Sequence, residues 1–240
     1  MEKVIYALWK KEGQAPDAFR DELLQTMAPA LAQSKSVHSL RLCVADSAVE
    51  AAVGRRMAAQ DPYPDAVASV WVDYAGDAQQ WEPMIAPNVA RYSAYLVAEA
   101  EPLVNQEAHP TAPGERMHGM CHVVFMAPPQ DMDYHDWLAV WKDSHTQIAI
   151  DTQSTFGYRQ NLVLRVLTEG AYACHAIVEE NFPPEAMTDD HAFYATGGDA
   201  AVLKANMTAM MESCSRFIDF TKIDCIPMSE YLVKPLVARP

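Results

Sequence analysis

Hydrophobic residues along the chain follow two periods, and the same succession of periods occurs twice. Residues 3–9 and residues 121–127 are apolar runs of the length of a buried strand. After each run, apolar residues recur every four positions, which places them on one face of a helix. These positions are Phe19, Leu23, Met27 and Leu31 in the first half and, at a shift of 118 residues, Trp137, Trp141, His145 and Ala149.

The shift continues without a gap into a second strand, where Leu40 falls on Tyr158 and Arg41 falls on Arg159. The preceding helices begin near Pro16, which suits a first helical turn, and at Asp133, which can cap one. A third strand, a long helix and a last strand are predicted in each half. Their ranges are 66–74, 77–98 and 102–107 in the first half, and 171–180, 200–217 and 223–233 in the second.

The predicted order of elements is β-α-β-β-α-β twice, and this order is the ferredoxin-like unit. We expect an α+β protein with one repeat at residues 1–107 and a second at residues 117–240, joined by a segment rich in proline at 107–116. Helices cover one face of each sheet and leave the other apolar face open. The two open faces are expected to cover each other in one intramolecular barrel.

Charge and composition narrow the range of partners. The 240 residues carry 32 acidic and 18 basic side chains, a formal net charge of −14, which argues against nucleic acid or an anionic membrane as partner. The apolar run at the N-terminus is too short to span a bilayer and lacks the order of a signal peptide, so a cytoplasmic location is expected. Five cysteines without CxxC spacing predict buried free thiols.

Two segments resemble the EthD family of the dimeric α/β-barrel superfamily. The first is the helix pattern aromatic-x3-Trp-x3-His-x3-Ala, here Trp137, Trp141, His145 and Ala149. The second is the ending, here residues 217–231, in which a helix leads into a strand with proline and a Glu-Tyr pair. The resemblance implies a pocket between helices and sheet for a small, often aromatic or lactone-like molecule. Relatives include isomerases, cyclases, decarboxylases and monooxygenases.

The resemblance also singles out His145 and Tyr158 as candidate catalytic residues. Methylmuconolactone methylisomerase-like proteins place a histidine on this helix and a tyrosine thirteen residues later, as here. They use a second histidine between strands two and three, and the corresponding residues 168–170 contain none. His145 would act as general acid or base, and Tyr158 would donate a hydrogen bond. The alternative is a core histidine satisfied by one hydrogen bond.

Four further residues are candidate substrate contacts. Gln160 shares the face of Tyr158 by strand alternation. Trp137 and Trp141 are expected to pack in the core, and one of them to wall the pocket as well. His175 is placed in the middle of a strand, where a satisfied core histidine is the main alternative to a pocket residue.

Two other groups are given structural explanations. Arg41 and Arg159 face away from Tyr158, so we expect an ion pair at the seam between the sheets. The run from His118 to His122 includes Cys121 and suggests a metal. Cys121 and His122 nevertheless point to opposite faces of a strand, and no second cluster has ligand spacing, so no metal site is predicted.

The sequence leaves two classes of function open. One is an enzyme that acts on an aromatic, polyketide-like or lactone substrate by proton transfer, without a cofactor; neither GxGxxG nor a Walker motif occurs. The other is a non-catalytic binding or accessory protein for similar small molecules. A monooxygenase of the same superfamily is a third, weaker alternative, and further assembly into a homodimer is left open.

The two halves differ where the pocket is expected. Trp141, His145 and Tyr158 correspond to Leu23, Met27 and Leu40. These aliphatic side chains cannot exchange protons, so we predict one pocket per chain, in the second half, with the first half as scaffold. The connection at residues 46–65 is much longer than its counterpart and is a candidate lid over one of the two positions.

Overall fold

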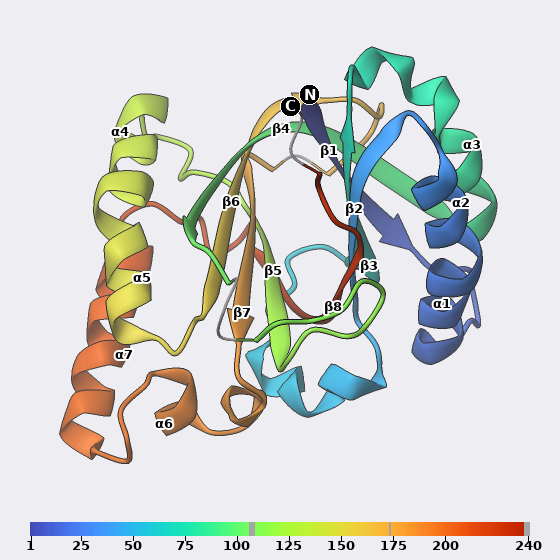
Figure 1. Ribbon diagram of the computed structural model, residues 1–240. Helices are drawn as coiled ribbons and strands as arrows, with labels where there is room; N and C mark the ends of the chain where they lie inside the picture. The colour runs from blue at the N-terminus through green and yellow to red at the C-terminus, as the bar shows by residue number, and fades with distance from the viewer. Residues whose placement is uncertain (106–108, 173, 238–240) are drawn as a thin grey trace.

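Antiparallel strands from both halves of the chain close into one barrel (Figure 1). The computed structural model describes residues 1–105, 109–172 and 174–237. Over these residues eight strands follow the order β1-β3-β2-β8-β5-β7-β6-β4, and every pair is antiparallel. Their bounds are β1 Glu2–Trp9, β2 Val37–Val44, β3 Ala66–Val72, β4 Arg91–Leu103, β5 Met120–Met126, β6 Gly157–Val166, β7 Ala176–Phe182 and β8 Asp224–Lys234.

Helices cover the barrel on two opposite sides (Figure 1). On one side, α1 (Pro16–Glu22) and α2 (Ala28–Gln33) are joined by a π-helical turn at Leu23–Met27, with α3 (Glu82–Ile85) nearby. On the other side, α4 (Tyr134–Ala139) and α5 (Thr146–Thr152) are joined by a π-helical turn at Val140–His145 and lie beside α7 (Ala200–Cys214), while α6 (Asp190–Phe193) lies below. None of the helices in the described ranges is long and apolar enough to cross a membrane.

The helices that begin with α1 and α4 start where the sequence predicted, and single residues at their first turns explain why. Pro16 occupies the first turn of α1, where its missing N–H is not needed. The Asp133 carboxylate accepts hydrogen bonds from the backbone N–H groups of His135 and Asp136, at 2.8 and 3.3 Å, and so caps α4.

The long helix predicted at residues 77–98 was wrong. Only short helical turns and α3 occur there, and β4 already begins at Arg91. Pro83 and Pro87 remove donors that a continuous helix needs, and the following residues include Tyr92, Tyr95 and Val97, which favour a strand. The last strand of this half is therefore 91–103 instead of 102–107, of which 106 and 107 lie outside the described residues. The strand expected at 171–180 likewise begins only at Ala176.

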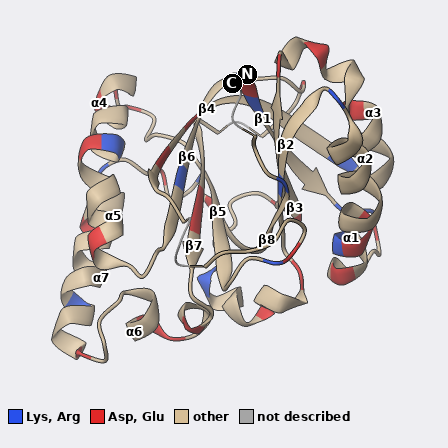
Figure 2. Ribbon diagram, in the orientation of Figure 1, with Lys and Arg blue, Asp and Glu red and all other residues tan. Residues whose placement is uncertain are grey.

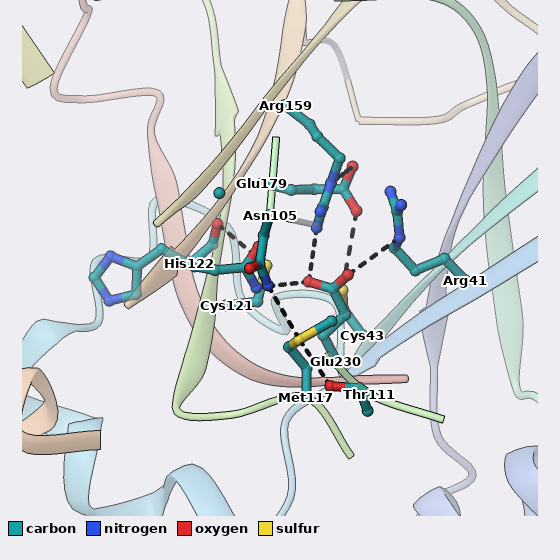
Figure 3. Close-up of polar contacts among 12 residues, drawn as sticks. Arg41, Cys43, Asn105, Thr111, Met117, Cys121, His122, Arg159, Glu179 and Glu230 are labelled. Carbon is teal, nitrogen blue, oxygen red and sulfur yellow. Dashed lines mark hydrogen bonds and ion pairs between the residues drawn. The ribbon is translucent and has the colours of Figure 1, made fainter. Parts of the chain in front are cut away.

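The interior of the barrel combines an apolar core with buried charges (Figure 3). Glu230 on β8 accepts from Arg159 of β6 at 2.7 Å and pairs with Arg41 of β2 at 3.1 Å. Although burial would raise the pKa of Glu230, these guanidinium groups hold it below its ordinary value. The predicted ion pair of Arg41 and Arg159 at the seam is thus confirmed, with Glu230 between them.

A second set of contacts extends this network to the remaining part of the interior. Glu179 on β7 pairs with Arg159 at 3.4 Å and with Lys3 of β1 at 3.3 Å, and Lys3 also meets Glu99 of β4 at 3.3 Å. Figure 2 shows these basic and acidic positions on the barrel strands themselves, such as β6 and β7. The six charges come from strands of both halves, so their pairing fixes how the halves join.

We predict that Arg159→Met destabilises the protein by about 3–5 kcal/mol, because Glu230 and Glu179 would lose a buried cationic partner. Urea unfolding measures the change. Arg165→Met is the matched control: Arg165 is exposed on the same strand and should change the free energy of unfolding by less than about 0.5 kcal/mol. Equal stability of the two variants would show that the network is dispensable.

Candidate active site

A cavity of about 320 Å³ lies between the second helical layer and the sheet beneath it. Of the residues singled out by sequence, Trp141, His145 and Tyr158 line it. Most of the wall is apolar or aromatic, which is typical of sites for small organic molecules. The main apolar wall residues are Val124, Met126, Val178, Phe193, Met210, Met211, Phe217, Ile218, Phe220 and Ile223.

Three titratable side chains form a row across the floor of the cavity. Tyr158 on β6 pairs directly with Glu180 on β7, and Glu180 pairs directly with His122 on β5. Directly paired residues share a face of the sheet, with Cβ atoms roughly 4.5–5.5 Å apart. All three side chains line the cavity. Strand register therefore places three polar residues that are distant in sequence side by side in one row.

Glu180 is the functional candidate that sequence reasoning missed. Burial raises the pKa of its carboxyl to about 7, and no hydrogen bond or ion pair holds it among the described residues. Both its protonated and its ionised form are therefore populated near neutral pH, as a general acid or base requires. A signal was available: adjacent acids in a strand face opposite ways, so one of Glu179 and Glu180 had to face the helices.

His145 is neutral at pH 7 and oriented by the last helix. Burial, with a smaller contribution from Arg216, lowers its pKa to about 4. Its Nδ1 lies 2.9 Å from Oγ of Ser213, and that oxygen accepts from Arg216 at 3.2 Å. We assign the tautomer with the imidazole proton on Nε2, in which the Ser213 hydroxyl donates to Nδ1. The residue ends a π-helical turn, a feature frequent at functional sites.

Tyr158 is a hydrogen-bond donor rather than a base. Burial, and next the charge of Glu180, raise its pKa far above the ordinary value, so the hydroxyl keeps its proton. Nε1 of Trp141 donates to this hydroxyl at 3.3 Å, which leaves the phenolic proton for another acceptor. The ring of Trp137 packs behind Trp141, with centroids 5.4 Å apart.

His122 completes the row in an apolar corner. Burial, assisted by Arg55, lowers its pKa to about 3, and its buried Nε2 has no hydrogen-bond partner among the described residues. Nδ1 lies 3.5 Å from Sγ of Cys225, and burial raises the pKa of that thiol. The pair is thus a neutral imidazole beside a neutral thiol, and the arrangement does not favour a thiolate nucleophile.

The other predicted contacts lie outside the cavity wall. Gln160 is buried behind it, where it donates to Thr146 at 2.7 Å and accepts from Lys142 at 3.1 Å. Trp137 is buried and supports Trp141 from behind. The expectation of a mid-strand core position for His175 was wrong: the residue precedes β7 and is exposed.

The long connection at residues 46–65 lines this cavity, and it also lines a second cavity together with first-half residues such as Lys10 and Asp17. It crosses the foot of the barrel (light blue in Figure 1), and its residues 54–57 line the wall. Met57 exchanges two backbone hydrogen bonds with Cys225, at 2.9 and 2.8 Å. The buried carboxylate of Asp224 accepts from the backbone of Ala59 and Gln60. These contacts anchor the connection to β8 as a fixed wall.

The corresponding place in the first half is packed. Leu40 pairs with Val70 and Val70 with Val4, so the row across β2, β3 and β1 is entirely aliphatic. Met27 and Leu23 lie above it, and all five side chains are fully buried. No group in this row can exchange a proton.

Potential metal ligands converge elsewhere, inside the barrel. One ligand atom each of Cys43, Cys121 and Glu230 lie within 4.8 Å of one another. Figure 3 shows Cys121 and His122 leaving β5 on opposite sides, as the alternation predicted. Arg41, Arg159 and Asn181 occupy the carboxylate oxygens of Glu230, so this acceptor is committed to the ion-pair network.

Comparison with known proteins identifies the fold. No protein-family model and no curated protein matches the chain. An anthrone oxidase-like protein of known structure matches with a TM-score of 0.59 and 9% identity, over 100% of this chain and 96% of that one. A protein provisionally described as a monooxygenase, from Lactobacillus acidophilus, gives 0.49 and 8%, over 99% of each chain. A mutant chlorite dismutase from Candidatus Nitrospira defluvii gives 0.45 and 10%, over 97% and 92%.

At such low identity the first match shows a shared fold alone. The chain is a mixed α+β protein that shares this fold, with its eight described strands in one antiparallel barrel.

We predict that Glu180→Gln stabilises the protein at pH 8 but not at pH 4. The folded-state pKa of about 7 lies above the value of 4.5 for an unfolded chain. Ionisation therefore disfavours the folded state, beginning above pH 4.5 and reaching its full effect above pH 7. The gain at pH 8 is on the order of 3 kcal/mol, since one pKa unit corresponds to about 1.4 kcal/mol.

Thermal and urea unfolding at both pH values measure this difference. Glu185→Gln, which alters an exposed carboxyl close by, is the control and should change stability little at either pH. A gain that is the same at pH 4 and pH 8 would mean that Glu180 has an ordinary pKa.

Proposed function

We propose that the protein is an enzyme that transfers a proton on a small, flat aromatic ketone or phenol without a nucleotide cofactor, with Glu180 as the acid–base group. The observation that carries the proposal is a carboxyl with a pKa of about 7, free of any partner among the described residues, on the floor of a largely apolar cavity. A carboxyl in this condition is costly for stability and suited to proton transfer.

Ionised Glu180 removes a proton from a carbon next to, or conjugated with, a carbonyl group. The electron pair of the broken C–H bond moves into the substrate, and the negative charge comes to lie on the carbonyl oxygen. The Tyr158 hydroxyl and the Nε2–H of His145 are the donors for that oxygen, and the apolar surroundings strengthen both hydrogen bonds. Protonated Glu180 then returns the proton: return to the same carbon gives exchange with solvent, and return to another carbon gives an isomerase-type reaction.

In this assignment His145 is a donor instead of the base. A pKa of about 4 makes its imidazole a weak base, and Ser213 occupies its Nδ1. Tyr158 keeps the role of donor that the sequence resemblance implies.

The cavity supports an aromatic substrate. Its volume of about 320 Å³ is more than twice the roughly 150 Å³ of a cavity that takes up benzene. Trp141, Phe193 and Phe217 supply flat walls, while methionines of α7 adapt to different shapes. The name of one solved neighbour refers to anthrone, a tricyclic aromatic ketone with an acidic CH₂ group. Anthrone is therefore a suitable test compound.

The same proposal includes the organisation of the chain. The strand orders β4-β1-β3-β2 and β8-β5-β7-β6 are the same in the two halves, which supports two ferredoxin-like repeats at residues 1–107 and 117–240. The helix from Trp137 to Ala149 supports kinship with the EthD family. The first repeat serves as scaffold, and the second carries the pocket.

We predict that the protein accelerates exchange of the CH₂ protons of anthrone for deuterium, measured by NMR in D₂O under nitrogen. Glu180→Gln should lower the catalysed rate by about 10²–10⁴-fold, the usual contribution of a general base. The rate should rise with pH and reach half its maximum near pH 7, where Glu180 ionises. Glu185→Gln is the control and should retain full activity.

The alternatives give different results. Binding of anthrone without catalysed exchange would indicate a binding or accessory protein. Uptake of one O₂ per anthrone in air, with anthraquinone and water as products, would indicate an oxidase acting on the same carbanion. Exchange at the wild-type rate in Glu180→Gln would refute the role of this carboxyl.

A further inference from the structure

One arginine on the cavity wall, Arg56, has no acceptor for its side-chain N–H groups in the part of the chain that the structure describes. Arg56 forms no side-chain hydrogen bond or ion pair with the described residues, and its Nε is buried without a partner. Its guanidinium carbon lies over the ring of Tyr63, 4.9 Å from the ring centre. The chain has 32 acidic residues against 18 basic ones, yet no carboxylate among the described residues pairs with this cation.

The neighbouring arginine shows the contrast. Arg55 also lines the cavity, but it donates to Asp190 at 2.6 Å and to the carbonyl oxygen of Ala186 at 3.0 Å. Its guanidinium also lies over the ring of Phe193, at 4.5 Å. Arg55 is thus engaged by the protein itself, while Arg56 keeps its donors free.

The backbone holds Arg56 at the cavity. The residue caps the 3₁₀ helix Ser47–Arg55, and the next residue, Met57, is bridged to Cys225 of the cavity wall. Arg56 reaches the cavity from the connection bridged to β8, whereas Glu180 lies on β7, and β5 separates these two strands. A ligand that reaches both groups spans the cavity.

A second cavity, which Arg56 also lines, is less suited to an anion. Its wall includes Asp17, Asp46, Glu50 and Asp65. Four carboxyl groups against two basic side chains, Lys10 and Arg56, make this wall acidic on balance, whereas the first cavity presents two arginines, one carboxyl group (Glu180) and an otherwise largely apolar wall.

We propose that Arg56 binds a carboxylate on the substrate, so that the ligand is an aromatic acid whose anionic end lies at Arg56 and whose reacting carbon lies at Glu180. The inference rests on the proposed function for the orientation of the ligand, but the anion site is testable by binding alone. A guanidinium with free N–H groups matches a planar carboxylate with two hydrogen bonds.

Two probes of the same shape test the inference: 1-naphthoate, which is anionic, and 1-naphthamide, which is neutral. Isothermal titration calorimetry at about pH 6, where Glu180 is mostly protonated, gives both affinities and the number of sites per chain. Wild-type protein should bind the naphthoate at one site per chain and at least about tenfold more tightly than the amide, as a charge-assisted hydrogen bond provides.

Variants connect the preference to Arg56. Arg56→Met should remove the preference for naphthoate: naphthoate binding should weaken about tenfold or more, while amide binding stays within twofold. Arg56→Lys should retain part of the preference. Arg165→Met, an exposed arginine elsewhere, should change neither affinity. Unfolding temperatures within a few degrees of wild type ensure that the variants are folded.

Three results would overturn the inference: equal affinities in the wild type, a preference that survives in Arg56→Met, or no binding of either probe. Its failure is separable from failure of the proposed chemistry. Proton exchange on neutral anthrone that depends on Glu180 but not on Arg56 would leave the enzyme and remove the anion site. A preference for naphthoate that depends on Arg56, without any proton exchange, would leave the anion site and remove the enzyme.

Discussion

The buried ion-pair network inside the barrel is the constraint on which the site depends. Arg159 and Glu179 must face the interior to meet Glu230 and Lys3. Their chain neighbours Tyr158 and Glu180 must then face the helices, because successive strand residues point to opposite sides. A slip of one residue would turn both the charges and the reactive groups to the wrong face. The interior pairing therefore determines the register of the row on the cavity floor.

The two halves of the barrel differ in what their matching rows of side chains do: one row packs, and the other carries titratable groups. The row Val4, Val70 and Leu40 in the first half is apolar and fully buried, and contributes stability by burial. In the second half the corresponding row is His122, Glu180 and Tyr158, whose polar groups are costly to bury. The first half thus provides a closed apolar core, and the second half holds polar groups whose hydrogen-bonding capacity is only partly used.

The candidate site gathers groups that are neutral or unpaired at neutral pH. His122 and His145 have lowered pKa values, that of Glu180 is raised, and Arg56 lacks an acceptor among the described residues. Apart from His145, which is hydrogen-bonded to Ser213, these groups depart from the usual rule that buried polar groups are paired. Such departures are expected where function, and not stability, selects the residue. The long connection at residues 46–65 has the same character, since its anchors on β8 place an unpaired cation at the cavity.

The sequence by itself determined which face each residue takes. The period of two along the strands predicted Arg41 and Arg159 at the seam. Together with the period of four along the helix, it predicted His145 and Tyr158 on one side of the second sheet. Pro16 and Asp133 predicted where two helices begin. Periodicity misled at residues 77–98, where two prolines override helical spacing. Only the tertiary structure brought Glu180, His122 and Arg56 to one cavity, because strand register and the path of a distant connection depend on contacts between residues far apart in the chain.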